Sequence, residues 1–191
     1  MVSTSNDVSV DDRIIDAAAG CVIAFGVDRV TLAEIARRAG VSRPTVYRRW
    51  PDTRSIVASL LTTRIMNALR DHAVRGTGRE ALVAQMVAVA AELRDDEVIM
   101  SVLHTGADLA MVYITERMGT SQQRLLEVVI EAIAAAQRDG SVRPGDARRM
   151  AAMCLLILQS AVQSARMVAA VLDAVTLDTE LAHSLNGYLC P

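Results

Sequence analysis

Apolar residues recur every three or four positions along most of the chain, and no stretch alternates apolar and polar residues convincingly. A spacing of three and four is typical of amphipathic helices, whereas a spacing of two would indicate strands. The pattern therefore predicts an all-α fold. We expect helices near 11–25, between Thr31 and Gly40, between Ser42 and Trp50, and near 53–74, 79–94, 96–104, 107–118, 120–138, 146–172 and 177–189.

The two short helices in the first third of the chain have clear end signals. The stretch "TLAE" predicts a capping box, in which Thr31 caps the amide of Glu34 and Glu34 reaches back. Gly40 ends the first helix. Ser42 caps the second, where Pro44 is tolerated because first-turn amides lack helical partners.

These two helices are joined by the four residues "AGVS", a length that suits a helix-turn-helix. Ala36 is small where two crossing helices come closest, and Gly40 permits the positive φ of the turn. Val46, six residues after Gly40, directs the second helix back into the core. An ordinary helical corner in a bundle would show the same spacing. The residues on the exposed face of the second helix must therefore distinguish a helix-turn-helix from such a corner.

The charge distribution sets this segment apart. All 20 basic residues are arginine, and the whole chain has a net charge of −2. Residues 29–54 hold 7 Arg and 2 acidic residues, a local net charge of +5. With Val46 buried, the second short helix presents Arg43, Thr45, Tyr47 and Arg48, which are side chains that suit base edges and phosphates. Such a helix fits the major groove of DNA.

Residues 31–57, "TLAEIARRAGVSRPTVYRRWPDTRSIV", resemble the DNA-binding signature of the tetracycline-repressor (TetR) family. The resemblance covers roughly residues 11–60. The matching positions are Thr31, Ile35, Ala36, Ala39, Gly40, Val41, Ser42, Thr45, Val46, Tyr47, Trp50 and Ile56. The resemblance implies a three-helix DNA-binding head, a connecting helix, and a helical body that binds a ligand and forms a dimer.

The resemblance also implies roles for single residues. Thr31 and Tyr47 would contact phosphates, while Arg43, Pro44 and Thr45 would lie against bases. Two positions depart from the family pattern: Trp50 replaces the usual Phe, and Thr53 stands where many members carry a lysine that contacts phosphate. Arg54, or the Thr53 hydroxyl with the helix N-terminus, would have to supply that contact.

We therefore expect a flexible tail at 1–10 and a DNA-binding head at 11–56, with its helix-turn-helix at about 32–50. Residues 57–191 would form the connecting helix and the ligand-binding and dimerisation domain. A head of this size reads few base pairs alone, so a homodimer on a two-fold DNA operator is expected. Two apolar stripes on the later helices predict the dimer surface, or else the core of the protein itself: Leu125, Val129, Ile133, Met150, Cys154, Ile157, Ala161 and Ala165.

A small hydrophobic effector is a further expectation for the body. Methionines can line an adaptable pocket, although scattered methionine is also common core filler. Polar residues within apolar segments can orient a ligand, and Gln159 and Gln163 can instead bond across a dimer. The candidate ligand-binding residues are Met86, Met100, His104, Asp108, Met111, Tyr113, Gln159 and Gln163.

The sequence gives little evidence for catalysis or for a metal or nucleotide site. The three cysteines do not pair closely, and no residues have the spacing of a metal site, a phosphate loop or a catalytic triad. We therefore expect no enzyme activity, no metal and no cofactor. The segment at 151–158 is too short to span a bilayer, and the N-terminus lacks a secretion signal, so a cytoplasmic protein without a membrane partner is expected. A non-specific architectural DNA-binding protein stays open, as does a helical enzyme or carrier with a vestigial head.

Overall fold

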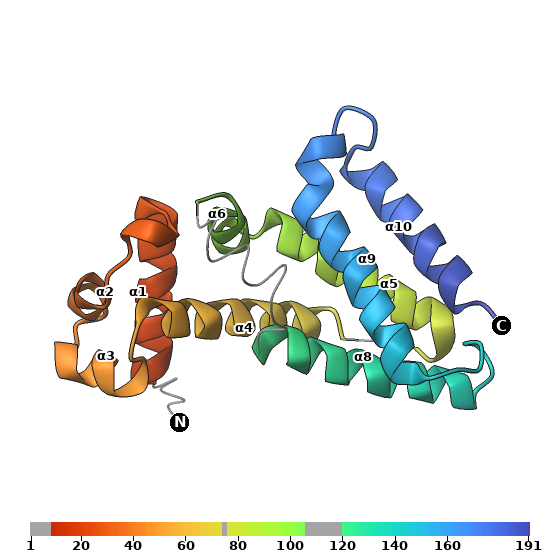
Figure 1. Ribbon diagram of the computed structural model, residues 1–191, viewed down its shortest axis with the longest axis horizontal. Helices are drawn as coiled ribbons and strands as arrows, with labels where there is room; N and C mark the ends of the chain where they lie inside the picture. Colours follow the sequence, from red (N-terminus) through yellow and green to blue (C-terminus); the bar gives the residue numbers. More distant parts are fainter. Residues whose placement is uncertain (1–8, 74–75, 106–119) are drawn as a thin grey trace, which may run out of the picture.

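The computed structural model describes residues 9–73, 76–105 and 120–191. These residues form nine α-helices and one short 3-10 helix, without a strand among them (Figure 1). The all-α prediction is therefore confirmed. The predicted helix at 107–118 and nearly all of the predicted tail at 1–10 lie outside the described residues.

The helix boundaries lie close to those expected from the sequence. The N-terminal helices are α1 (Val10–Phe25), η1 (Val27–Arg29), α2 (Leu32–Ala39), α3 (Arg43–Arg49) and the connecting helix α4 (Thr53–Asp71). The later helices are α5 (Gly78–Asp95), α6 (Glu97–Thr105), α8 (Thr120–Arg138), α9 (Ala147–Val168) and α10 (Ala174–Leu189). Helix α4 ends three residues before the predicted Val74, and α9 ends four residues before the predicted boundary at 172.

Most of the predicted caps of α2 and α3 are present. Gly40 has a φ of 65° in the left-handed region, and the Ser42 hydroxyl accepts a hydrogen bond from the Thr45 amide. The Thr31 hydroxyl accepts from the Glu34 amide at 3.2 Å. The other half of the predicted capping box is wrong, because the Glu34 carboxylate instead binds the guanidinium groups of Arg37 and Arg38.

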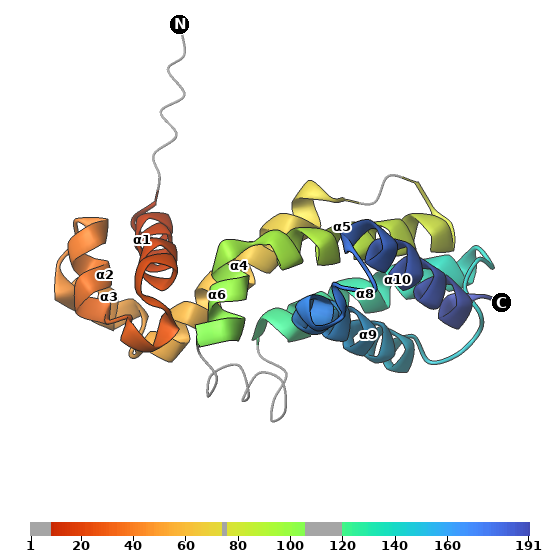
Figure 2. The ribbon, with the colours of Figure 1, turned by 90° about the horizontal axis from the view of Figure 1, so that it is seen from above.

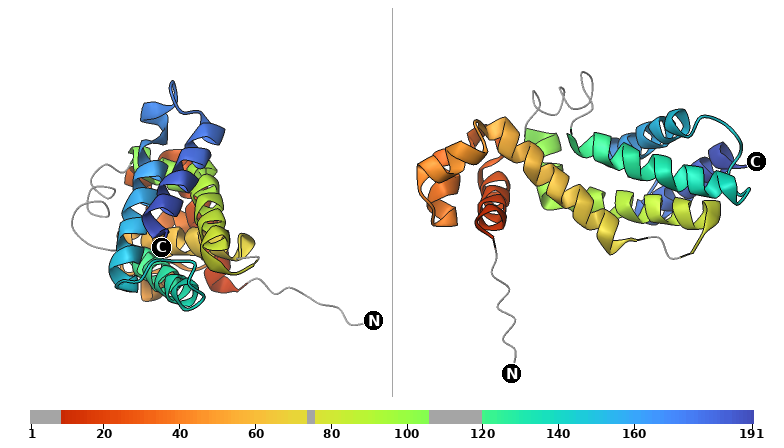
Figure 3. Two further views of the ribbon diagram at one scale, coloured as in Figure 1. Left: turned by 90° about the vertical axis from the view of Figure 1, so that its right-hand side faces the viewer. Right: turned by 90° about the horizontal axis from the view of Figure 1, so that it is seen from below.

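The buried residues form two hydrophobic clusters. One is built by α1, α2, α3 and the start of α4, and it includes Val98 and Val102 of α6. The second is built by α5, α8, α9 and α10. Figures 2 and 3 show α1–α3 gathered at one end of the molecule, with α4 running from them to the second group of helices. The head (residues 11–56) therefore completes its core with side chains from α4 and α6.

Helix α9 is long and apolar enough to cross a membrane by length and composition alone. It continues beyond Gln159 and Ser160, so the argument from the length of 151–158 does not hold. Packing inside the protein accounts for part of its apolar character. Met150, Ala151 and Cys154 are buried against α5, α8 and α10, so this helix supplies one side of the second core.

Candidate DNA-binding surface and apolar cavity

Helix α3 has one buried and one exposed face. The Val46 side chain is fully buried in the cluster beneath it, as its spacing from Gly40 predicts. Arg43, Pro44 and Arg48 are exposed, and Tyr47 is 51% exposed. Within the described residues, the Tyr47 hydroxyl forms no hydrogen bond, so it can donate to a phosphate oxygen. Arg43, Pro44, Tyr47 and Arg48 are therefore accessible to a binding partner at the surface of α3.

The arginines around this face fall into two groups. Arg37 and Arg38 both bind Glu34, and their hydrogen bonds lower the pKa of Glu34 to about 2. Arg49 pairs with Asp11, which lies 38 positions earlier in the chain. The ion pairs of Arg37 and Arg38 therefore lie within α2, whereas that of Arg49 joins α3 to α1.

Arg13 also has a structural role. Its guanidinium donates to the carbonyl of Ala39 at 2.7 Å, at the C-terminal end of α2. By contrast, Arg43, Arg48 and Arg54 are exposed and have no ion pair within the described part of the chain. Exposed arginines without an ion pair among the described residues thus lie at the start and middle of α3 and the start of α4, and Arg29 in η1 is a further one.

The three threonines of the predicted site have hydrogen-bonding partners inside the head. Thr31 caps α2, and the hydroxyls of Thr45 and Ser42 lie 2.7 Å apart. The Thr53 hydroxyl faces the Val30 carbonyl at 3.5 Å. Asp52 already caps the N-terminus of α4 through the Ser55 amide, and Arg54 in the first turn of this helix is exposed.

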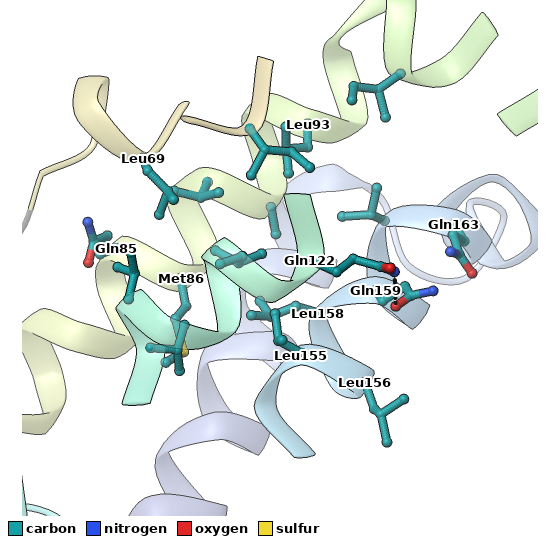
Figure 4. A pocket seen from close by; sticks show the side chains of 18 of the residues that line it. Leu69, Gln85, Met86, Leu93, Gln122, Leu155, Leu156, Leu158, Gln159 and Gln163 are labelled. Carbon is teal, nitrogen blue, oxygen red and sulfur yellow. Dashed lines mark hydrogen bonds between the residues drawn. The ribbon is translucent and has the colours of Figure 1, made fainter. Parts of the chain in front are cut away.

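A cavity of about 340 Å³ lies between α4, α5, α6, α8 and α9 (Figure 4). Its volume is in the range of small-molecule sites. Leucine, valine and isoleucine form most of the wall, and the polar residues lining it are Gln85, Gln122, Gln159 and Gln163. Met86, Gln159 and Gln163 were expected from the sequence. The leucines of α4 and the two glutamines on α5 and α8 were not, because apolar periodicity does not distinguish a core face from a cavity wall.

Among the described residues, the predicted ligand residues Met100 and His104 do not line this cavity. His104 is exposed, and its Nδ1 atom lies 2.6 Å from the carbonyl oxygen of Met100 one turn earlier. Neither His104 nor Met100 reaches the cavity, because both lie on another face of α6 from Ile99 and Val102. A ligand-binding role for these two residues stays a prediction outside this cavity. Asp108, Met111 and Tyr113 lie outside the described residues.

Four of the predicted dimer residues are buried inside the protein itself. The side chains of Val129, Ile133, Met150 and Cys154 are at most 4% exposed in the second core. Burial also raises the pKa of the Cys154 thiol to about 11. These four cannot form a surface for a second chain, and they belong to the core of the protein itself, which is the alternative that the apolar stripes left open. They form the apolar faces of α8 and α9 that pack inside the protein.

The other four predicted dimer residues are partly exposed. Leu125 lines the cavity. Ile157 and Ala161 pack against the second core, and Ala165 is half-buried near the end of α9. A different set of apolar side chains faces outward from α9, α10 and the turn between them. These exposed residues, which sequence reasoning missed, are Met153, Leu156, Met167, Val171 and Val175.

The arrangement defines a class of protein. A helix-turn-helix with an exposed, arginine-bearing second helix is the geometry of a DNA-binding protein, and the cavity adds a space for a small molecule. Among the described residues, no group of three His, Cys, Asp or Glu side chains is placed to hold a metal ion.

Comparison with known proteins agrees with this class. Residues 14–60 match the model of the bacterial regulatory proteins of the tetR family. The chain is 63% identical, over 191 residues and the full length of both, to the "Uncharacterized HTH-type transcriptional regulator Rv2250c" of Mycobacterium tuberculosis (strain ATCC 25618 / H37Rv). The protein therefore belongs to the TetR family of transcriptional regulators and is not an enzyme.

Solved structures share the fold at low sequence identity. The TetR family repressor AlkX of Dietzia sp. strain DQ12-45-1b matches with a TM-score of 0.70 and 20% identity, over 94% of this chain and 95% of AlkX. The transcriptional regulator FadR of Bacillus subtilis, in complex with stearoyl-CoA, matches with a TM-score of 0.62 and 20% identity, over 93% of this chain and 98% of FadR.

Proposed function

We propose that this regulator is a cytoplasmic, homodimeric repressor that releases its DNA operator when a small hydrophobic effector enters the cavity. The exposed face of α3 is the observation that carries the proposal. Arg43, Pro44 and Thr45 read base edges in the major groove, and Tyr47 binds a phosphate together with Arg48. Thr31, Thr53 and Arg54 flank this face and complete the phosphate contacts. The name of AlkX as a repressor supports the direction of regulation.

The homodimer forms through the outer face of α9 and α10. Leu156 is 63% exposed and Met167 is 80% exposed on α9, while Val171 and Val175 lie in and after the turn that follows it. Exposed apolar side chains grouped on one surface are typical of protein interfaces. We expect Met167→Glu to convert the dimer to a monomer in sedimentation experiments, whereas Leu156 also lines the cavity and is not a clean test of the dimer surface. Ile23→Glu, at a 49% exposed apolar residue of α1, is the matched control and leaves the dimer intact.

The effector acts on the head through α6. Ile99 and Val102 of this helix line the cavity, and Val102 also belongs to the core of the head. The Ser101 hydroxyl donates to the carbonyl of Val22 at 3.1 Å, and the Thr105 hydroxyl accepts from the amide of Val27 at 3.0 Å. A ligand changes DNA affinity only by binding one arrangement of these helices better than another.

Footprinting on the DNA upstream of the gene tests the dimeric repressor directly. We expect two protected half-sites related by two-fold symmetry, with their centres about 34–36 Å apart or a multiple of this. Protection of one half-site alone would contradict the dimer, and uniform protection of any DNA would favour an architectural protein. The double variant Arg43→Ala and Tyr47→Phe should abolish the footprint while the protein stays folded, because both side chains are exposed.

A further inference from the structure

The wall of the cavity carries no charge within the described residues. Of the 24 side chains that line it, 20 are apolar and the other four are glutamines. A carboxylate or a phosphate moved from water into such a wall loses its hydration and finds no cation to replace it. An ionised ligand head group is therefore disfavoured inside this cavity, even though hydrocarbon fits it well.

The polar end of the cavity is formed by amides on α8 and α9. Gln122 donates to the side-chain oxygen of Gln159 at 3.3 Å, which orients the Gln159 amide (Figure 4). Within the described residues, the Gln159 amide nitrogen donates to no acceptor, and the side chain of Gln163, one turn further along α9, forms no hydrogen bond. Both amides can therefore donate to an oxygen atom of a bound molecule.

The cavity volume sets the size of this molecule. A volume of about 340 Å³ lies at the lower end of the range for small-molecule sites. The wall is made of branched aliphatic side chains, with methionine at one position and without an aromatic ring among its described residues. Its chemistry thus suits an alkyl chain.

We propose that the effector is an uncharged alkyl compound that carries one neutral oxygen acceptor, a hydroxyl or a carbonyl, held by Gln159 and Gln163. This inference rests on the proposed function only in naming the occupant an effector. The binding specificity itself follows from the cavity. A free fatty acid, by the same reasoning, is a poor ligand in its ionised form.

Calorimetric titration of the full-length protein, without DNA, tests the specificity with two probes of equal chain length. The probes are 1-decanol and decanoate, at about pH 8, where the carboxyl group is ionised. We expect 1-decanol to bind one molecule per chain, and decanoate to bind at least about tenfold more weakly, since an unpaired charge is buried. Equal or tighter binding of decanoate would overturn the proposal.

Two variants locate the binding. Gln159→Leu together with Gln163→Leu should weaken 1-decanol binding by about three- to tenfold, whereas unchanged affinity would remove the amides from the site. Ala132→Phe places a ring into the cavity from α8 and should abolish binding. Ala135→Phe, on the exposed side of the same helix, is the matched control and should bind as the wild type does.

The outcome also separates this proposal from the regulatory one. Failure of 1-decanol to bind the wild-type protein, or equal binding by Ala132→Phe and Ala135→Phe, would refute the inference without affecting the DNA-binding proposal. Tight 1-decanol binding by a protein that does not bind its upstream DNA would support the inference and refute the repressor.

Discussion

Replacing Thr105 by valine tests the contact between the cavity-lining helix and the head. The Thr105 hydroxyl accepts a hydrogen bond from the Val27 amide at 3.0 Å and donates to the Ser101 carbonyl at 2.7 Å. Valine keeps the shape of the side chain but removes the hydroxyl, so the Val27 amide loses this partner. Gly26 confirms how close the two elements lie, because a Cβ atom there would be 3.1 Å from the Thr105 hydroxyl oxygen.

The size of the effect follows from the environment of this hydrogen bond. An unpaired buried donor costs about 1–3 kcal/mol. Since Thr105 itself is exposed and water can reach it, we expect the lower end, about 1 kcal/mol. For a chain of this length that corresponds to a fall in Tm of about 2–4 °C. Thermal unfolding followed by circular dichroism measures this shift.

Thr63→Val is the matched control for this experiment. The Thr63 hydroxyl donates only to the Ser59 carbonyl within α4, so its loss breaks no contact between elements. We expect a change within about 0.5 kcal/mol for this variant. Thr105→Val should also reduce the effect of a bound effector on DNA affinity. If both variants behaved alike in stability and in effector response, the role of α6 as the link would be refuted.

Three further outcomes can be measured on the head and the cysteines. Tyr47→Phe should weaken binding to all DNA sequences by about 1 kcal/mol, whereas Arg43→Ala should cost about 1–3 kcal/mol on the operator and flatten sequence preference; equal effects of both on every sequence would remove Arg43 from base reading. The pKa of Glu34 is about 2 in the folded protein, below its usual 4.5. Its ion pairs therefore stabilise the protein fully above pH 4.5, and this stabilisation is lost as pH falls towards 2. Glu34→Gln should flatten this part of the Tm–pH curve. A thiol reagent at pH 8 should modify only the exposed Cys190 in the folded protein, since burial raises the pKa of Cys154 to about 11 and that of Cys21 as well; two or three reactive thiols would contradict the packing.

The features predicted best from the sequence depend on neighbours a few positions away. Thr31, Gly40 and Ser42 determine the ends of α2 and α3 through bonds to residues at most five positions apart. The resemblance to the TetR family covers this same segment. Both kinds of signal are local, and for that reason the helix boundaries and the outward face of α3 could be predicted.

Most of the errors concern contacts between distant segments. Periodicity shows that Val129, Ile133 and Cys154 lie on apolar faces, but it does not show whether the same chain or a second chain covers them. The pairing of Arg49 with Asp11 likewise requires the fold to bring α1 beside α3. The pairing of Glu34 with Arg37 and Arg38, by contrast, lies at helical spacing and could have been predicted.

The central claim is that the exposed face of α3 reads a DNA sequence. Fluorescence anisotropy with DNA from the region upstream of the gene, against scrambled DNA of equal length and across a salt series, tests it most directly. We expect the upstream DNA to bind more tightly at near-physiological salt, with a preference that Arg43→Ala reduces. Equal binding of both DNAs that disappears as salt rises would contradict the claim and favour a non-specific DNA-binding protein.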